Sequence, residues 1–166
     1  MRTHWQEDRE IFVVALDVNG NETVVLSARE VMNHAAAVVA VASRAAFDAA
    51  VIEQADQLGL ANGAGFALAS KLRKARLPVD HTATAPLRFE PVIDRQARAW
   101  VRVSLRTTAV SRWSVAETHT YARTLWTTQQ RAEDETTYRQ VLIAAMGMEE
   151  TLAASVVHDI GTLHKF

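Results

Sequence analysis

Runs of hydrophobic residues predict two strands near the start of the chain. Residues 11–17 and 22–27 are rich in β-branched and aromatic side chains, and the segment Val18-Asn19-Gly20-Asn21 separates them. Asn-Gly between two such runs is the strongest short-range signal for a β-hairpin. We therefore predict an antiparallel hairpin over residues 11–27.

A long helix is predicted to follow this hairpin. Ser27 and Glu30 have the spacing of a capping box, which satisfies backbone N–H groups at a helix start. From Ala28 to about Leu58 the chain is rich in alanine and favours helix, and residues 35–42 are apolar on every side. Such a helix must be buried, either centrally or in a dimer interface, so an aspartate at Val38 or Val39 should disrupt the fold or the oligomer.

Glycine and proline punctuate the middle of the chain. Gly59, Gly63 and Gly65 interrupt the helical pattern, which resumes over Phe66–Arg76 until Pro78 ends it. All three prolines fall within residues 77–91, which indicates an extended connection there. This segment is the candidate subdomain connection.

A strand is predicted next, because residues 98–106 alternate with period two. One side carries Ala99, Val101, Val103 and Leu105, and the other carries Arg98, Trp100, Arg102, Ser104 and Arg106. A half-buried strand has this pattern.

The last third of the chain favours helix. Ser114 and Glu117 form a second capping box, and helix-favouring sequence continues to about Asp159, with breaks expected near Glu133-Asp134 and Gly147. The elements predict one α+β domain over residues 1–166. In it an N-terminal β-hairpin and an antiparallel sheet pack against a long Ala-rich helix and C-terminal helices. No internal repeat is visible in the sequence.

Composition supports a folded domain and closes several chemistries. The chain is 49% hydrophobic and 22% charged with 6 Gly and 3 Pro, unlike a disordered or collagenous sequence. The absence of Cys excludes disulfides, thiol nucleophiles and Cys-ligated metals. The polar N-terminus is unlike a signal peptide, and no uncharged run reaches the roughly 18 residues of a membrane span. We expect a cytoplasmic protein with no membrane partner.

Charge is unevenly distributed, although the net charge is only −1. Residues 1–70 carry −5, residues 71–112 carry +7 and residues 113–166 carry −3. The clustering of arginine in the middle is the informative feature.

Residues 51–76 contain an Ala55…Gly59 spacing followed by a short helix. This pattern resembles the helix-turn-helix of DNA-binding proteins, in which Ala lets two helices approach and Gly takes the turn. The resemblance implies that basic side chains of the second helix contact phosphates. They are Lys71, Arg73, Lys74 and Arg76. The alternative is two packed helices with a solvated basic end.

The polar side of the strand at 98–106 is a second candidate site. Its arginines would neutralise phosphates and its tryptophan would offer a stacking plane to nucleic acid. The residues are Arg98, Trp100, Arg102 and Arg106, with Arg112 and Trp113 just beyond. In the alternative interpretation these arginines pair with the acidic thirds of the chain or of a partner subunit.

The tetrapeptide His158-Asp159-Ile160-Gly161 follows an apolar run, and His119 lies upstream. This arrangement resembles the metal-binding dyad of HD-domain phosphohydrolases. The resemblance implies a metal-dependent hydrolase, whereas a helix end with no metal is the alternative. A catalytic metal generally needs at least three protein ligands.

These observations favour non-enzymatic binding of nucleic acid, most of all DNA, by a homodimer joined through apolar helix faces. We expect no cofactor, no metal and no catalytic residue. A structural or assembly homo-oligomer is the alternative, and a remnant HD-type phosphohydrolase is the third hypothesis.

Overall fold

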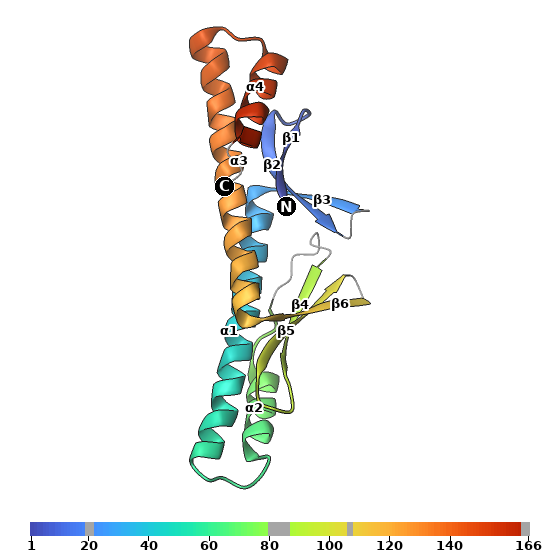
Figure 1. The fold of residues 1–166 in the computed structure, drawn as a ribbon, viewed down its shortest axis with the longest axis vertical. Coiled ribbons are helices and arrows are strands. Elements are labelled where there is room, and N and C mark those ends of the chain that lie inside the picture. Colours follow the sequence, from blue (N-terminus) through green and yellow to red (C-terminus); the bar gives the residue numbers. More distant parts are fainter. Residues whose placement is uncertain (19–21, 80–86, 106–107, 164–166) are drawn as a thin grey trace. The chain divides into compact units, whose positions relative to one another are not determined.

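The computed structural model describes residues 1–18, 22–79, 87–105 and 108–163 and has an α+β fold (Figure 1). Its strands form two three-stranded antiparallel sheets in this part of the chain, ordered β1-β2-β3 and β4-β5-β6. In chain order the elements are β1 (Arg2–Gln6), β2 (Ile11–Val18), β3 (Glu22–Leu26), α1 (Ala28–Gln57), α2 (Ala64–Ala75), β4 (Leu87–Ile93), β5 (Ala99–Leu105), β6 (Thr108–Ser114), α3 (Val115–Met146) and α4 (Glu150–Leu163).

The chain divides into two compact units. Unit 1 comprises Met1–Val31 and Thr124–Phe166, and unit 2 comprises Met32–Arg123. Unit 1 therefore contains the sheet β1–β3, most of α3 and all of α4. Unit 2 contains the sheet β4–β6, most of α1 and all of α2. The candidate connection at residues 77–91 lies inside unit 2. Its last residues, 87–91, belong to the edge strand β4.

Unit 2 is held together by one face of α1 packed against its sheet. Phe89 on β4 is 1% exposed and makes aromatic contacts with Trp113 and Tyr121. The buried apolar core consists of Val38, Val41, Ala42 and Ala45 of α1, Phe89, Val101 and Val103 of the sheet, and Ala122 of α3. Trp113, which the sequence placed just beyond the polar face of the predicted strand, packs against this core.

The apolar character of α1 is only partly explained by this core. Val38 is fully buried, as predicted, but Val39 is 39% exposed, because it lies on the other side of the helix. Central burial therefore holds for Val38 and not for Val39, and burial of Val39 in a dimer interface stays a prediction. The helix is also long and apolar enough to cross a membrane by length and composition, with a mean hydropathy of 1.8 in its most apolar window.

Unit 1 has a separate core. Phe12 of β2 packs with residues of α3 and α4, and Trp5 of β1 lies against Phe12 with ring centroids 5.0 Å apart. The buried members are Phe12, Ala132, Leu142, Ala153 and Val157. β1 was not predicted, because the polar sequence of residues 2–6 offers only Trp5 as an apolar anchor.

Several local predictions are confirmed. Strands β2 and β3 pair antiparallel, and residues 19–21, where the sequence predicts the hairpin turn, lie outside the described residues. The Glu30 carboxylate accepts hydrogen bonds from the Ser27 N–H at 2.8 Å and from the Ser27 hydroxyl at 2.7 Å, so the first capping box forms. The second forms as well, with 2.6 Å between the Ser114 N and Glu117 Oε2.

The break expected near Glu133-Asp134 is wrong, because α3 continues through it to Met146. Gln129 donates a side-chain hydrogen bond to Glu133 one turn later at 3.1 Å, and the Thr137 hydroxyl donates to the Glu133 carbonyl. Charged residues favour solvent but do not interrupt a helix. The predicted break at Gly147 is confirmed, since its φ of 61° is left-handed.

Residues 51–76 resemble a helix-turn-helix in sequence, but the second helix of this segment does not cross the first. α2 runs back along α1 (Figure 1), with Gly65 packed on Ile52 at one end and Arg73 paired with Asp48 at the other. Helices of a helix-turn-helix meet at a steep angle of about 90–120°. Residues 51–76 therefore form an antiparallel αα-hairpin.

The element order β-β-β-α-α occurs twice, so the structure contains a repeat that the sequence conceals. Ser27 and Glu30 of the first half correspond to Ser114 and Glu117 of the second, and the same separation relates most buried positions of α1 to buried positions of α3. These pairs are Val31 and Thr118, Ala35 and Ala122, Val38 and Leu125, Ala42 and Gln129, Ala45 and Ala132, Asp48 and Glu135, Ile52 and Arg139, and Ala55 and Leu142. Each unit combines the sheet of one half with the long and short helices of the other.

Candidate anion-binding surface

The predicted site residues of α2 separate into two pairs. Arg73 and Arg76 turn toward α1, where Asp48 is fully buried. Arg73 donates from Nε and Nη2 to Asp48 Oδ2 at 3.2 and 3.0 Å. Arg76 Nη1 lies 2.8 Å from Oδ1, as an ion pair outside hydrogen-bond geometry, and its guanidinium lies over the Phe47 ring. These two arginines therefore have a structural partner.

Lys71 and Lys74 are exposed on α2. Within the described part of the chain, neither ammonium group pairs with a carboxylate. Their charges are therefore available to an anion from solution.

Two predicted site residues, Arg98 and Trp100, contact Asp94, which follows β4. The Asp94 carboxylate accepts hydrogen bonds from Arg98 Nε at 2.9 Å, from the Trp100 indole at 3.1 Å and from Arg112 Nη2 at 3.4 Å. It also accepts the backbone N–H groups of Gln96 and Arg98. Burial would raise the pKa of Asp94, but these hydrogen bonds hold it far below its ordinary value. The carboxylate is thus a fixed negative charge.

Two guanidinium groups lie near the Trp100 ring. The Arg112 guanidinium carbon lies 4.4 Å from the indole centroid, and that of Arg98 lies 5.8 Å from it. A base that stacks here would meet a guanidinium plane or displace one.

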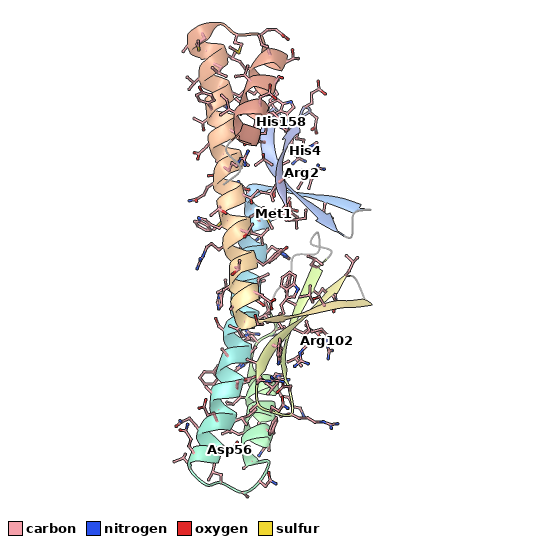
Figure 2. All side chains as sticks on the ribbon, viewed as in Figure 1. Met1, Arg2, His4, Asp56, Arg102 and His158 are labelled. Atoms are coloured by element: carbon pink, nitrogen blue, oxygen red, sulfur yellow. The ribbon has the colours of Figure 1, made fainter. Side chains whose placement is uncertain are left out.

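Arg102 lies in the middle of the outer face of the sheet, where it is cross-strand neighbour to both Glu90 and Arg112 (Figure 2). Its guanidinium is 3.5 Å from the Glu90 carboxylate, and both side chains are more than half exposed. Arg106 lies outside the described residues. The described acids that face these arginines thus come from the same sheet, rather than from the acidic thirds of the chain.

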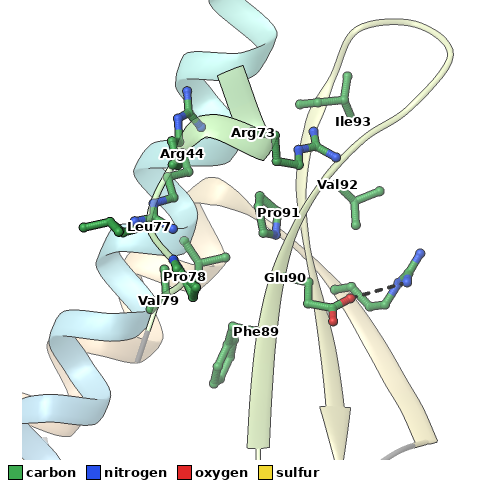
Figure 3. A pocket seen from close by; sticks show the side chains of 13 residues that line it. Arg44, Arg73, Leu77, Pro78, Val79, Phe89, Glu90, Pro91, Val92 and Ile93 are labelled. Carbon is green, nitrogen blue, oxygen red and sulfur yellow. Dashed lines mark ion pairs between the residues drawn. The ribbon is translucent and has the colours of Figure 1, made fainter. Parts of the chain in front are cut away.

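A pocket of about 580 Å³ brings the two predicted clusters together (Figure 3). Arg73 and Arg76 line it from α2, and Arg102 lines it from β5. Sequence reasoning missed Arg44 on α1, which also lines the pocket, because it stands alone in an apolar helix more than 25 residues from the basic segment. Lys71, Lys74, Arg98 and Trp100 do not line it.

The histidine-aspartate pair of the resembled phosphohydrolase lies on α4 of unit 1, and both side chains are exposed. Figure 2 labels His158 on this helix. His119 lies on α3 in unit 2. No group of three or more metal-ligating side chains that could hold a metal ion occurs among the described residues. The hydrolase hypothesis has no ligand set in this part of the chain.

The two units carry opposite charges. Unit 2 has 12 basic and 7 acidic side chains, for a net charge of +5, and unit 1 has 6 and 12, for −6. The division into two units thus separates positive from negative charge more sharply than a division of the sequence at its midpoint does.

No family model matches the chain, and no curated protein or solved structure is significantly similar to it.

Proposed function

We propose that this chain is a non-enzymatic nucleic-acid-binding protein, with DNA the favoured target, and that unit 2 makes the contact. The observation that carries the proposal is the net charge of +5 on unit 2 beside −6 on unit 1. Phosphate neutralisation supplies most of the affinity of such proteins, so a separate basic unit is what this function needs.

The ion pairs on the sheet are compatible with this function. Arg98 and Arg102 are 63% and 52% exposed while paired with Asp94 and Glu90. Exposed ion pairs contribute only about 0–1 kcal/mol, so a phosphate can compete for the arginine. Lys71 and Lys74 add two exposed charges on α2.

The test is the salt dependence of binding to a short DNA duplex. Each phosphate contact should contribute a slope of about −0.9 in log affinity against log salt. Replacing Lys71 and Lys74 by Ala, and separately Arg102 and Arg112, should each flatten the slope by about two contacts if all four side chains meet phosphates. Fluorescence anisotropy between 50 and 300 mM salt measures it.

The matched control is Arg9→Ala with Arg29→Ala. Both arginines are exposed in unit 1, so this variant changes the net charge equally without touching unit 2. Its slope should equal that of the unmodified chain. Absence of binding to duplex and single-stranded DNA at low salt would refute the proposed function.

Trp100→Ala distinguishes the form of nucleic acid. If single-stranded bases stack at this position, the variant should lose about 1–3 kcal/mol of binding energy. Duplex binding should change little, since phosphates dominate it.

A second function, assembly into a homo-oligomer, is favoured by the opposite charges of the units. The basic unit of one copy would then contact the acidic unit of another. This interpretation expects no nucleic-acid affinity, and it expects Arg102→Ala with Arg112→Ala to reduce the oligomer size. Sedimentation at low and high salt decides between the two functions.

A further inference from the structure

The pocket of unit 2 has the construction of a ligand site. We propose that it binds a phosphate monoester attached to an apolar or aromatic body. This inference shares Arg102 with the proposed nucleic-acid surface, but it stands on the pocket alone and concerns a defined small group rather than a strand along the surface.

The charge of the pocket is positive and partly fixed in place. Four arginines line it, at positions 44, 73, 76 and 102. Glu90 in the wall and Asp48, which pairs with Arg73 and Arg76, offset two of these charges, so the described residues give the pocket a net charge of +2. Because Asp48 is fully buried and holds Arg73 and Arg76, two of the guanidinium groups are oriented before any ligand arrives.

Arg44 supplies a positive charge that has no carboxylate partner among the described residues. It is half-buried on α1. A cation that is partly withdrawn from water and left without a counter-ion favours an anion from solution. Guanidinium groups bind phosphate and carboxylate through two parallel hydrogen bonds.

The other walls are apolar. Val41 and Phe89 are each 1% exposed, and the pocket lies between the segment after α2 on one side and β4 on the other (Figure 3). The remaining apolar lining residues are Leu77, Pro78, Val79, Pro91, Val92 and Ile93. A volume of about 580 Å³ lies in the range of sites for small organic ligands and is far larger than a phosphate ion requires.

The arginines and the apolar walls of the pocket together indicate the class of ligand. A phosphate monoester carries about −1.5 to −2 charges at neutral pH, which matches the net charge of the pocket better than a single carboxylate does. The apolar walls require a body that gains from leaving water. A free nucleotide-like small molecule and the phosphorylated end of a nucleic-acid strand share this chemistry.

The first experiment is calorimetric titration of the full chain with 1-naphthyl phosphate, inorganic phosphate and 1-naphthol. We expect saturable 1:1 binding of naphthyl phosphate, at least about tenfold tighter than either part alone, because each part fills only one half of the pocket. Equal affinity for naphthyl phosphate and naphthol, or no saturable binding, would overturn the proposal.

Variants locate the ligand. Arg44→Ala and, separately, Arg102→Ala should each weaken naphthyl phosphate about tenfold or more, which is the effect of one charge-assisted hydrogen bond. Arg95→Ala removes an exposed arginine of the same unit outside the pocket and should change affinity by less than about twofold. Circular dichroism checks that each variant is folded. Unchanged affinity in both pocket variants would place the ligand elsewhere and sink the assignment.

The source of the phosphate is found with two oligonucleotides that differ only in a 5′-phosphate or a 5′-hydroxyl. If the ligand is a strand end, the phosphorylated form should bind about tenfold tighter, and Arg44→Ala should abolish the difference. If it is a free molecule, the oligonucleotides should bind equally while naphthyl phosphate still binds. Naphthyl phosphate binding without DNA binding would refute only the proposed function, and the reverse would refute only the pocket.

Discussion

At the scale of single residues, Asp48 holds two arginines in place from a fully buried position. Its partners differ in exposure, since the Arg76 side chain is 22% exposed and that of Arg73 is 44% exposed. Solvent weakens an ion pair, so the more buried partner should be coupled more strongly.

A pair of double-mutant cycles tests this difference. The coupling free energy of Asp48 with Arg76 should be about 1–3 kcal/mol, and that with Arg73 should be below about 1 kcal/mol. Urea denaturation of the single and double alanine variants measures both values. Equal couplings would mean that exposure does not govern the strength of these pairs.

Asp94 gives a prediction in pH. Burial would raise its pKa, but four hydrogen bonds from Arg98, Trp100 and Gln96 hold the pKa in the folded chain far below the ordinary 3.8. A carboxyl group whose pKa is lower in the folded chain than in the unfolded chain stabilises the fold at pH values above its unfolded pKa. This stabilisation is lost as the pH falls through the folded pKa.

The free energy of unfolding of the unmodified chain should therefore exceed that of Asp94→Asn at pH 5–7. The difference should shrink as the pH falls below about 3.8. Urea titrations at a series of pH values measure it, and a difference that stays constant down to pH 2.5 would contradict the assignment.

The sequence shows which residues are charged, but it does not predict the groups with which they form ion pairs. The sequence placed Arg73 and Arg76 among the predicted phosphate contacts, whereas the structure pairs them with Asp48, about 25 residues earlier. Only the packing of α2 on α1 brings these groups together. The same packing adds Arg44 to the pocket.

At the scale of elements, the two faces of α1 differ although both are apolar. Val38 is fully buried in the core of unit 2, whereas its neighbour Val39 is 39% exposed. Val38→Asp should cost several kcal/mol, because it buries an unpaired carboxylate. Val39→Asp should change stability by less than about 1 kcal/mol. Thermal unfolding of both variants measures the contrast, and equal destabilisation would show that Val39 is covered, as in a dimer interface.

The close approach of α2 to α1 rests on Gly65. A Cβ atom at this position would lie 2.8 Å from the Ile52 Cα and 3.1 Å from the Ala55 Cβ. Alanine normally stabilises a helix relative to glycine by about 1 kcal/mol. Gly65→Ala should instead destabilise the chain, by about 1–3 kcal/mol, because backbone atoms must move apart. An increase in melting temperature would show that the helices can separate without cost.

Elements with local signals could be predicted, and those that depend on distant partners could not. Both long helices begin at capping boxes that the sequence contains within four residues. β1 has no such signal, since its partner β2 and the aromatic contact of Trp5 with Phe12 stabilise it. The charged pair at 133–134 misled the prediction because a polar helix face resembles a loop in composition.

At the scale of the whole molecule, the duplicated β-β-β-α-α order was hidden because the halves share a burial pattern rather than residue types. Val38 corresponds to Leu125 and Asp48 to Glu135, so these positions stay buried while their side chains change. Equivalent positions also meet, since His34 and Tyr121 lie 3.3 Å apart between Nε2 and the hydroxyl oxygen. Such patterns predict the fold class. They do not predict that the helices of each half pack on the sheet of the other half.

This exchange of helices predicts which sheet is destabilised when a core side chain is truncated. Val41 on α1 contributes to the core of unit 2, with Phe89 and Val103 of the second sheet, although β1–β3 precede α1 in the chain. Val157 on α4 contributes to the core of unit 1, with Phe12 of the first sheet. Val→Ala at either position leaves a small cavity that costs roughly 1–3 kcal/mol without unfolding the chain.

Amide hydrogen exchange of the two variants should therefore give crossed results. Val41→Ala should accelerate exchange in β4 and β5 and leave β1 and β2 near their original rates. Val157→Ala should do the opposite. The reason is that local opening follows the contacts that are lost, rather than the order of elements along the chain. If Val41→Ala accelerated exchange chiefly in β1–β3, each helix would be packing on the sheet of its own half, and the exchanged arrangement of the two units would be wrong.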